Sequence, residues 1–283
     1  MNRKINRLVT DYRQGGINRR DFMKRLVLYA GGTAAAFALL EASGESAVAA
    51  ELMQDTGIVA EFITYPVEGG TMKGLLAHPT EKKKYPAVIV IHENRGLVPH
   101  IQSVNRRMAM EGFLALAPDG NSPLGGTPED DTKGMELLRQ IPSETHTKNF
   151  VAAVKYLQTH PLSNGKVGCT GFCWGGAVTN QVAVNAPELK ASVPYYGRVP
   201  ATEDVPKIKA AVMAHYAEND AGINAGIEGF REAMKNAGIE HQIFTYPGTG
   251  HAFNNDTNPG RYNEEAAKLA WGRTVAFFKE KLK

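Results

Sequence analysis

The stretch most suited to chemistry is the hexapeptide at residues 171–176, Gly-Phe-Cys-Trp-Gly-Gly. It follows a short apolar run and precedes residues typical of a helix. Its Gly-x-Cys-x-Gly-Gly spacing is that of a nucleophile elbow with cysteine in place of serine. Glycines on both sides of Cys173 let a strand and a helix approach closely, so the thiol can be exposed in a strained turn. The alternative is a buried cysteine at an ordinary strand-to-helix turn.

Two further polar groups follow predicted strands nearer the C-terminus. The acidic residues Glu218 and Asp220 come after a predicted strand at residues 210–215, and His251 comes after another at 241–246. A histidine can take the proton of a thiol, and a carboxylate can hold the imidazole in one tautomer. The order nucleophile, acid, histidine is that of α/β-hydrolases. We predict Asp220 as the acid, with Glu218 as its competitor.

The remaining cysteine and histidines are predicted to be structural. Cys169 and Cys173 are four residues apart in a predicted strand and turn, which separates them by about 13 Å, beyond the roughly 7 Å limit for a disulfide. We therefore expect two free thiols, with Cys169 an inert core residue. His92, His215 and His241 lie at strand edges, and no HExxH or CxxC spacing occurs, so neither a metal nor a cofactor is predicted.

The elements that must position these residues alternate along the chain from residue 51 onward. Two strands at residues 58–65 and 71–77 read as an antiparallel hairpin across Gly69 and Gly70. Further strands are predicted at 85–91, 112–117, 167–170, 191–196, 210–215 and 241–246, and helices at 100–111, 132–140, 143–158, 177–186, 222–236 and 263–281. This alternation predicts an α/β fold with one doubly wound, mostly parallel sheet and an N-terminal antiparallel hairpin. Ligands of such sheets bind at the carboxyl ends of the strands.

Composition indicates a soluble globular chain without a nucleic-acid surface. Of 283 residues, 43% are hydrophobic and 22% are charged, which suffices for one well-filled domain. The formal charge is +3, but the first fifty residues hold 8 of the 32 basic and 4 of the 29 acidic residues. The rest of the chain therefore carries 24 basic and 25 acidic residues, so no basic patch points to nucleic acid.

Residues 1–50 resemble a twin-arginine export signal. Asn18-Arg19-Arg20-Asp21-Phe22-Met23-Lys24 is followed by an uncharged run at 26–40 and by Ala47-Val48-Ala49. The uncharged run is shorter than the roughly 20 residues that span a bilayer, so we expect cleavage near Ala49 or Ala50. The resemblance implies the twin-arginine export machinery as a partner and a periplasmic mature protein without a membrane span. The alternatives are retention as a membrane anchor, and an amphipathic N-terminal helix.

Residues 55–283 resemble the dienelactone hydrolase family of α/β-hydrolases. The matching motifs are Gly-x-Cys-x-Gly-Gly at 171–176, the acid loop at 217–220 and Gly-x-Gly-His-x-Phe at 248–253. The resemblance implies an α/β-hydrolase domain at 51–283. It also implies Cys173 as nucleophile, Asp220 as acid and His251 as base.

A fourth family motif lies in His92-Glu93-Asn94-Arg95-Gly96, where the family has a glutamate after its third strand. The resemblance implies that Glu93 keeps the cysteine inactive until substrate arrives, and a carboxylate near a thiol can hold the thiol proton in an empty site. The alternative is a solvated loop carboxylate near Arg95. Stabilising the oxyanion requires N–H donors, and the elbow suggests the backbone N–H groups of Trp174 and Asn94.

The chain departs from the family where dienelactone hydrolases use arginines to hold a substrate carboxylate. Neither the loop after residues 117–119 nor the residues after 251–253 supply an arginine there. The sequence therefore does not favour dienelactone itself as the substrate. Arg261 could bring a guanidinium near the site, and the other substrate-binding candidates are Arg95, Arg198, Tyr196 and Phe253.

These patterns predict an exported, cofactor-free hydrolase of carboxylic esters or lactones that works through an acyl-enzyme on Cys173. The alternative is a small-molecule binding protein on the same fold that turns over slowly or not at all, because fold alone does not determine function.

Overall fold

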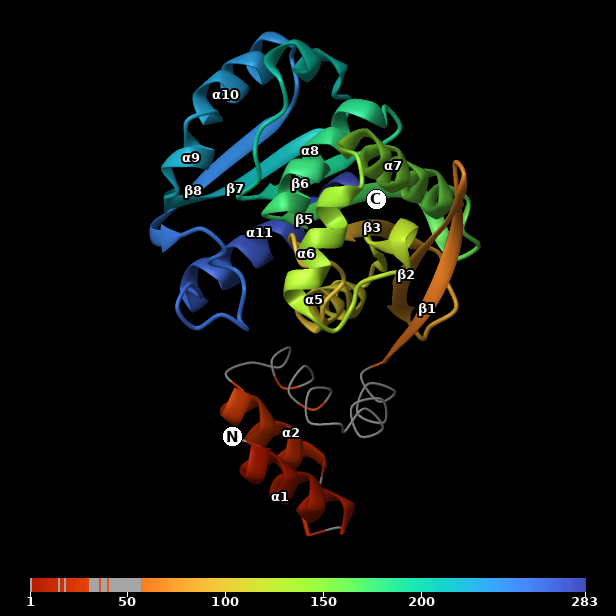
Figure 1. The fold of residues 1–283 in the computed structure, drawn as a ribbon, viewed down its shortest axis with the longest axis vertical. Helices are drawn as coiled ribbons and strands as arrows, with labels where there is room; N and C mark the ends of the chain where they lie inside the picture. Colours follow the sequence, from red (N-terminus) through yellow and green to blue (C-terminus); the bar gives the residue numbers. More distant parts are fainter. Residues whose placement is uncertain (1, 15, 18, 31–35, 37–39, 41–56) are drawn as a thin grey trace.

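The computed structural model describes residues 2–14, 16, 17, 19–30, 36, 40 and 57–283. The strands are β1 (Ile58–Val67), β2 (Gly70–Pro79), β3 (Tyr85–Ile91), β4 (Leu114–Pro118), β5 (Ser163–Phe172), β6 (Ala191–Tyr195), β7 (Ala211–Asn219) and β8 (His241–Gly250). They form one sheet in the order β1-β2-β4-β3-β5-β6-β7-β8 (Figure 1). β2 is antiparallel to both β1 and β4, and all other neighbours are parallel.

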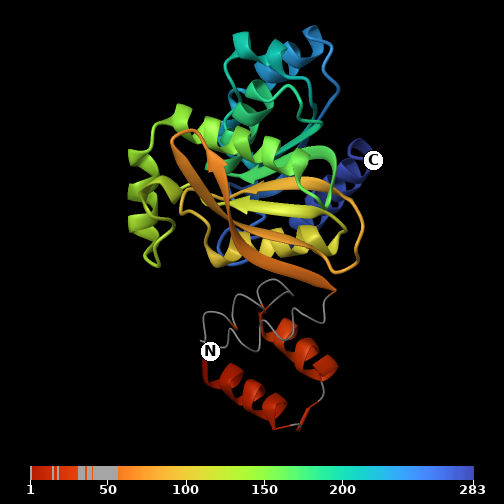
Figure 2. The ribbon, with the colours of Figure 1, turned by 90° about the vertical axis from the view of Figure 1, so that its right-hand side faces the viewer.

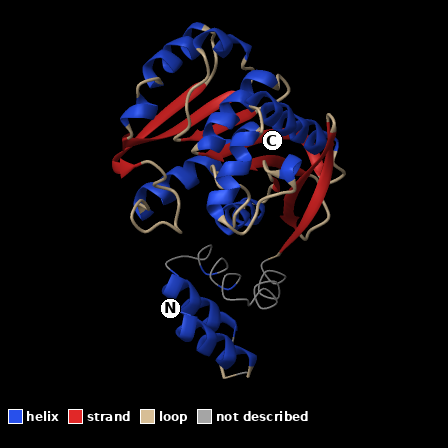
Figure 3. Ribbon diagram, viewed as in Figure 1, coloured by secondary structure: helices blue, strands red, loops and turns tan. Residues whose placement is uncertain are grey.

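Helices cover both faces of this sheet (Figure 3). They are α5 (Pro99–Met110), α6 (Asp131–Gln140), α7 (Ser143–Thr159), α8 (Trp174–Asn185), α9 (Ala221–Asn224), α10 (Ile227–Asn236) and α11 (Glu264–Lys281), with short 3-10 turns η1 (Ser122–Leu124) and η2 (Thr202–Lys207). Residues of α5 and α11 belong to one apolar core, and residues of α7, α8 and α10 to the other.

The position of β3 inside the sheet explains why its sequence is apolar throughout. Val88 and Val90 point into the core that contains α5 and α11, while Ala87, Ile89 and Ile91 point into the opposite core. Side chains alternate between faces along a strand, so a strand covered on both faces has no polar side. The predicted fold class, a mostly parallel sheet with an N-terminal antiparallel pair, is confirmed.

Some element boundaries differ from the prediction. The single helix predicted at 222–236 is interrupted, because Gly226 lies between α9 and α10. A Cβ at Gly226 would stand 2.6 Å from the side chain of Val199, so the backbone passes close to a neighbouring loop there. β5 begins at Ser163, earlier than predicted, because Ser163 pairs with Tyr85 of β3. Such pairings join segments that are distant in the sequence, so the residues near Ser163 give little indication of where the strand begins.

Two helices, α1 (Asn2–Arg13) and α2 (Arg19–Ala30), lie side by side in the N-terminal part of the chain (Figure 2). Their apolar faces bury one another in a small separate cluster that includes Ile5, Leu8, Val9, Phe22 and Leu26. The sequence interpretation had placed an export signal before residue 51, with an amphipathic N-terminal helix as an alternative. The spacing of residues 5, 8 and 9 is that of one helical face, which explains why α1 is amphipathic.

The predicted export signal overlaps this helical pair only in part. Its paired arginines begin α2, whereas the predicted cleavage site at Ala49 or Ala50 lies outside the described residues. Within the described part of the chain, no helix has the length and apolar character needed to cross a membrane.

Candidate active site

Cys173 lies at the sharp turn between β5 and α8. Its backbone has φ 56° and ψ −114°, a strained combination for a residue with a side chain. A Cβ at Gly171 would stand 2.3 Å from the carbonyl oxygen of Gly175, and a Cβ at Gly175 would stand 2.3 Å from that of His92. Both positions therefore require glycine, because any side chain would push the strand and the helix apart.

Backbone strain gathers around this turn. Among the described residues, Cys173, Tyr196 and Ala252 are the three that are not glycine and have positive φ. The ring of Tyr196 lies 5.1 Å from the ring of His251, and Ala252 directly follows that histidine. All three thus sit near the carboxyl ends of β5, β6 and β8, and strained backbone of this kind is concentrated at functional sites.

The sheet register brings the acid and the histidine together. Asn219 of β7 pairs with Gly250 of β8, so the next residues, Asp220 and His251, leave adjacent strands side by side. The Nδ1 of His251 donates to Oδ2 of Asp220 over 2.5 Å. The carboxylate of the competitor Glu218 instead accepts a backbone N–H of β8 at 2.8 Å. In this geometry Asp220, and not Glu218, orients the imidazole.

His251 is also hydrogen-bonded to Cys173. The bond to the Cys173 side chain, followed by that to Asp220, raises the pKa of His251 to about 9, although burial opposes the rise. The imidazole therefore holds a proton at neutral pH. A positive charge beside a cysteine sulfur stabilises the thiolate, which is the nucleophilic form.

Cys169, His215 and His241 each have a hydrogen-bond partner elsewhere in the fold. Cys169 is free and fully buried, and burial raises the pKa of its thiol to about 12. His215 bonds Tyr246 through Nδ1 at 2.8 Å, and burial lowers the pKa of His215 to about 3. His241 donates to the carbonyl of Ile239. Within the described ranges, no group of three His, Cys, Asp or Glu side chains is arranged to hold a metal ion.

Cys173 and His251 face a cavity of about 480 Å³. This volume is in the range of small-molecule sites. Its apolar lining residues include Met135, Leu138, Ile141 and Ile223. Polar groups at the same cavity include His146 and the guanidinium-bearing side chains of Arg139 and Arg198, neither of which forms an ion pair within the described chain.

Two backbone N–H groups are available beside the sulfur. The N–H of Trp174 is the first of α8 and has no intrahelical acceptor, and in the described structure the N–H of Asn94 is bonded to no backbone carbonyl. Both residues line the cavity with Cys173. The N–H of Cys173 itself is occupied, because it donates to the carbonyl of Tyr195 at 3.1 Å. The sequence names these two N–H groups as the oxyanion hole, and that role stays a prediction.

Glu93 is nearly buried, with 9% of its surface exposed, and it does not pair with Arg95. Its Oε2 accepts the side-chain N–H of Asn255 at 2.8 Å. The amide orientation of Asn255 is fixed, because its Oδ1 accepts the backbone N–H of Thr257. Arg95 instead bonds Asp131 at 2.8 Å, where both side chains are half exposed.

The structure separates the predicted substrate-binding residues. Tyr196 and Arg198 line the cavity that contains Cys173, whereas Arg95 does not, and Phe253 is fully buried. The sequence interpretation missed Arg139, on the last turn of α6, where a basic residue looks like ordinary helix surface. It also missed His146, whose place depends on how α7 crosses the sheet.

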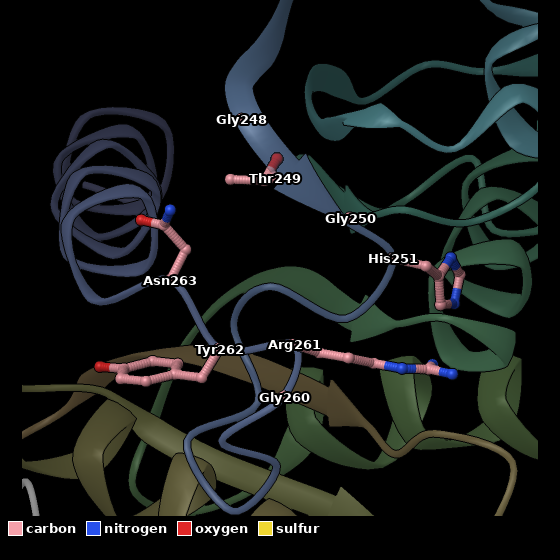
Figure 4. Close-up of a pocket in the computed structure, with 8 residues that line it drawn as sticks. All are labelled: Gly248, Thr249, Gly250, His251, Gly260, Arg261, Tyr262 and Asn263. Carbon is pink, nitrogen blue, oxygen red and sulfur yellow. The ribbon is translucent and has the colours of Figure 1, made fainter.

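A second cavity of about 640 Å³ also reaches His251 (Figure 4). It lies between the end of β8, at residues 248–251, and the loop at 260–263. In Figure 4 the side chain of Arg261 extends in the same direction as that of His251. The sequence predicted that Arg261 could bring a guanidinium near the site. Arg261 lines this cavity and not the one that contains Cys173.

A sheet of this order, with a sharp turn at Cys173 between β5 and α8, is the α/β-hydrolase fold. The chain belongs to the dienelactone hydrolase family, whose profile matches residues 72–282.

Named relatives agree with this assignment. A "Putative carboxymethylenebutenolidase" of Escherichia coli K12 is 32% identical, over 84% of this chain and 94% of its own. A Synechocystis protein of the same name is 33% identical, over 80% and 98%. The crystal structure of a "Putative Dienelactone Hydrolase" from Klebsiella pneumoniae has a TM-score of 0.71 at 31% identity, covering 78% of this chain and 98% of its own.

Proposed function

We propose that this protein hydrolyses carboxylic esters or lactones through an acyl-enzyme on Cys173. The observation that carries the proposal is the chain of contacts from Asp220 through His251 to Cys173 at the edge of a cavity. Membership in the dienelactone hydrolase family supports ester or lactone hydrolysis as the reaction class.

In the first half of the reaction, the sulfur of Cys173 attacks the substrate carbonyl carbon and the carbonyl oxygen becomes an oxyanion. The N–H groups of Trp174 and Asn94 donate to that oxyanion. As the intermediate collapses, the bond to the alkoxy oxygen breaks and His251 gives its proton to the departing alcohol. The product left on the enzyme is a thioester.

In the second half, His251 takes a proton from water, and the resulting hydroxide attacks the thioester carbonyl. The carbon–sulfur bond breaks, the acid leaves, and the sulfur recovers its negative charge beside the imidazolium. Asp220 stays ionised throughout and holds Nδ1 of His251 in place.

Glu93 acts as the gate of the nucleophile in this proposal. With the site empty, its carboxylate takes part in holding the thiol proton, and substrate binding releases the thiolate. Its burial supports a role inside the site, and its bond to Asn255 holds one oxygen of the carboxylate in place. The cavity would hold the acyl group against its apolar lining residues, with Arg198 and Arg139 binding polar substituents.

The test is steady-state hydrolysis of a short-chain aryl ester by the wild type, Cys173→Ala and the control Cys169→Ala. We expect turnover in the wild type and in the control, and none above background in Cys173→Ala. Equal activity of Cys173→Ala and the wild type would refute the cysteine mechanism. A single burst without turnover would instead favour the small-molecule binding protein.

We also propose that the chain is exported by the twin-arginine route and reaches the periplasm. The paired arginines, the uncharged run after them and the Ala-x-Ala sequence support this. Mass spectrometry of the exported protein should find a new N-terminus near Ala50 or Glu51. An intact Met1 in membrane fractions would refute cleavage and favour anchoring.

A further inference from the structure

His92 is fully buried and lines neither cavity. It directly precedes Glu93, at the end of β3, and its ring lies against the first residue of α8. No step of the proposed reaction uses it. Its contacts nevertheless reach both N–H donors.

The tautomer of His92 follows from its partners. The backbone N–H of Gly120 lies 2.8 Å from Nε2 and can only donate, so Nε2 accepts. The other nitrogen, Nδ1, lies 2.5 Å from the carbonyl oxygen of Glu93, which can only accept, so Nδ1 carries the proton. Burial lowers the pKa of His92, which keeps the ring in this neutral form.

The bond from Nδ1 fixes the peptide plane of the second donor. The carbonyl of Glu93 and the N–H of Asn94 belong to the same peptide group, whose atoms are coplanar. Holding the carbonyl oxygen on one side therefore sets the direction of the N–H on the other. Since Gly120 holds the opposite edge of the ring, His92 cannot tilt without losing a hydrogen bond.

The face of the same ring holds the first donor residue. The indole of Trp174 stacks on His92, with ring centroids 5.2 Å apart and planes 13° from parallel. The rings of His146 and Phe150 make T-shaped contacts with the indole, with ring centroids 4.9 Å and 6.0 Å from that of Trp174. The indole therefore anchors the start of α8, and Trp174 lines the same cavity as Cys173.

We propose that His92 is a positioning residue that orients both N–H donors of the oxyanion hole, one through the Glu93 carbonyl and one through the Trp174 indole. The inference rests on the proposed acyl transfer at Cys173. Misplacing a donor lowers the stabilisation of the transition state more than the binding of substrate, so its loss acts on kcat.

Three substitutions separate the contacts of His92. His92→Asn can place an amide N–H where Nδ1 is, so it retains the donor to Glu93. His92→Gln can place an oxygen where Nε2 is, so it retains the acceptor for Gly120. His92→Phe retains a flat ring against Trp174 and neither hydrogen bond.

We expect kcat for an aryl ester to fall about 10- to 100-fold in His92→Gln, which keeps neither contact to a donor residue, with KM within about threefold of the wild type. His92→Asn and His92→Phe should each show a smaller fall in kcat, because each keeps one of the two contacts. A trifluoromethyl ketone forms a carbon–sulfur bond to Cys173 and leaves an oxyanion in the hole. Its affinity should fall in parallel with kcat, while the affinity for the product acid stays the same.

Wild-type kcat in a folded His92→Phe, checked by thermal melting, would overturn the proposal. So would a loss in KM alone, or a loss of kcat in His92→Gln no larger than the losses in the Asn and Phe variants. If Cys173→Ala is as active as the wild type, the proposed function itself fails; if Cys173→Ala is inactive while the His92 variants are normal, only the role of His92 is refuted.

Discussion

The Asp220→Asn variant tests the charge arrangement of the site most directly. His251 has a pKa of about 9 in place of 6.5, which corresponds to roughly 3 kcal/mol in favour of the imidazolium. Cys173 and Asp220 supply this preference. An amide carries no charge and can offer the imidazole its N–H in place of its oxygen. We expect kcat/KM to fall by about 10²- to 10⁴-fold.

The pH profile gives a second readout with a definite sign. A raised pKa means that the His251 imidazolium persists as pH rises through 6.5 and is lost near pH 9. The departing alcohol needs that proton, so kcat/KM of the wild type should decline above about pH 9. Without the carboxylate of Asp220, the decline should move to lower pH, because one of the contributions that raise the pKa is gone.

The assay is aryl ester hydrolysis from about pH 6 to about pH 10, with Glu218→Gln as the matched control. Glu218 is a carboxylate two residues away that bonds a backbone N–H of β8, so its replacement should leave both rate and profile unchanged. Wild-type behaviour of Asp220→Asn together with loss in Glu218→Gln would refute the assignment and make Glu218 the acid.

Three further changes test the gate, the cavity and the elbow. Glu93→Gln should speed alkylation of the nucleophile by iodoacetamide in the empty enzyme about tenfold, and an unchanged rate would remove the gate. Arg198→Ala and Arg139→Ala should raise KM for carboxylate-bearing esters about 10-fold and leave neutral esters unaffected; equal effects on both would exclude charge recognition. Gly171→Ala should destabilise the fold by about 2 kcal/mol or more, measured by denaturant unfolding, because its Cβ would meet backbone at 2.3 Å. Gly222→Ala, where no atom lies within 4 Å of the added Cβ, is the control and should stay near the wild type.

Much of the sheet could be predicted because its signals are local. The apolar run at 85–91 belongs to a strand covered on both faces, and the close approach at Gly171 and Gly175 needs glycine at those positions in any such turn. An amphipathic N-terminal helix was an alternative to the export signal, but the pairing of α1 with α2 was not predicted, because it depends on contacts between the two helices. The break at Gly226 was missed because it depends on contact with a loop from elsewhere in the chain.

The partners of the charged side chains near the site could not be predicted. Glu93 bonds Asn255, which is 162 residues away, and Arg95 bonds Asp131 instead of facing the cavity. Arg139 reaches the cavity because α6 lies over it, which no pattern within α6 indicates. Such contacts depend on the path that each loop takes through space, and that path is set by the helices and strands at both ends of the loop.

The amino-acid sequence by itself determines which groups stand at the strand ends: a thiol at the elbow, carboxylates after β7 and a histidine after β8. Parallel strands end at the same edge, so these groups must lie near one another. Only the tertiary structure decides that Asp220 and not Glu218 meets His251, and that His92 lies between two N–H groups. A hydrogen bond requires atoms about 3 Å apart, and spacing along a chain sets distances to that accuracy only within one element.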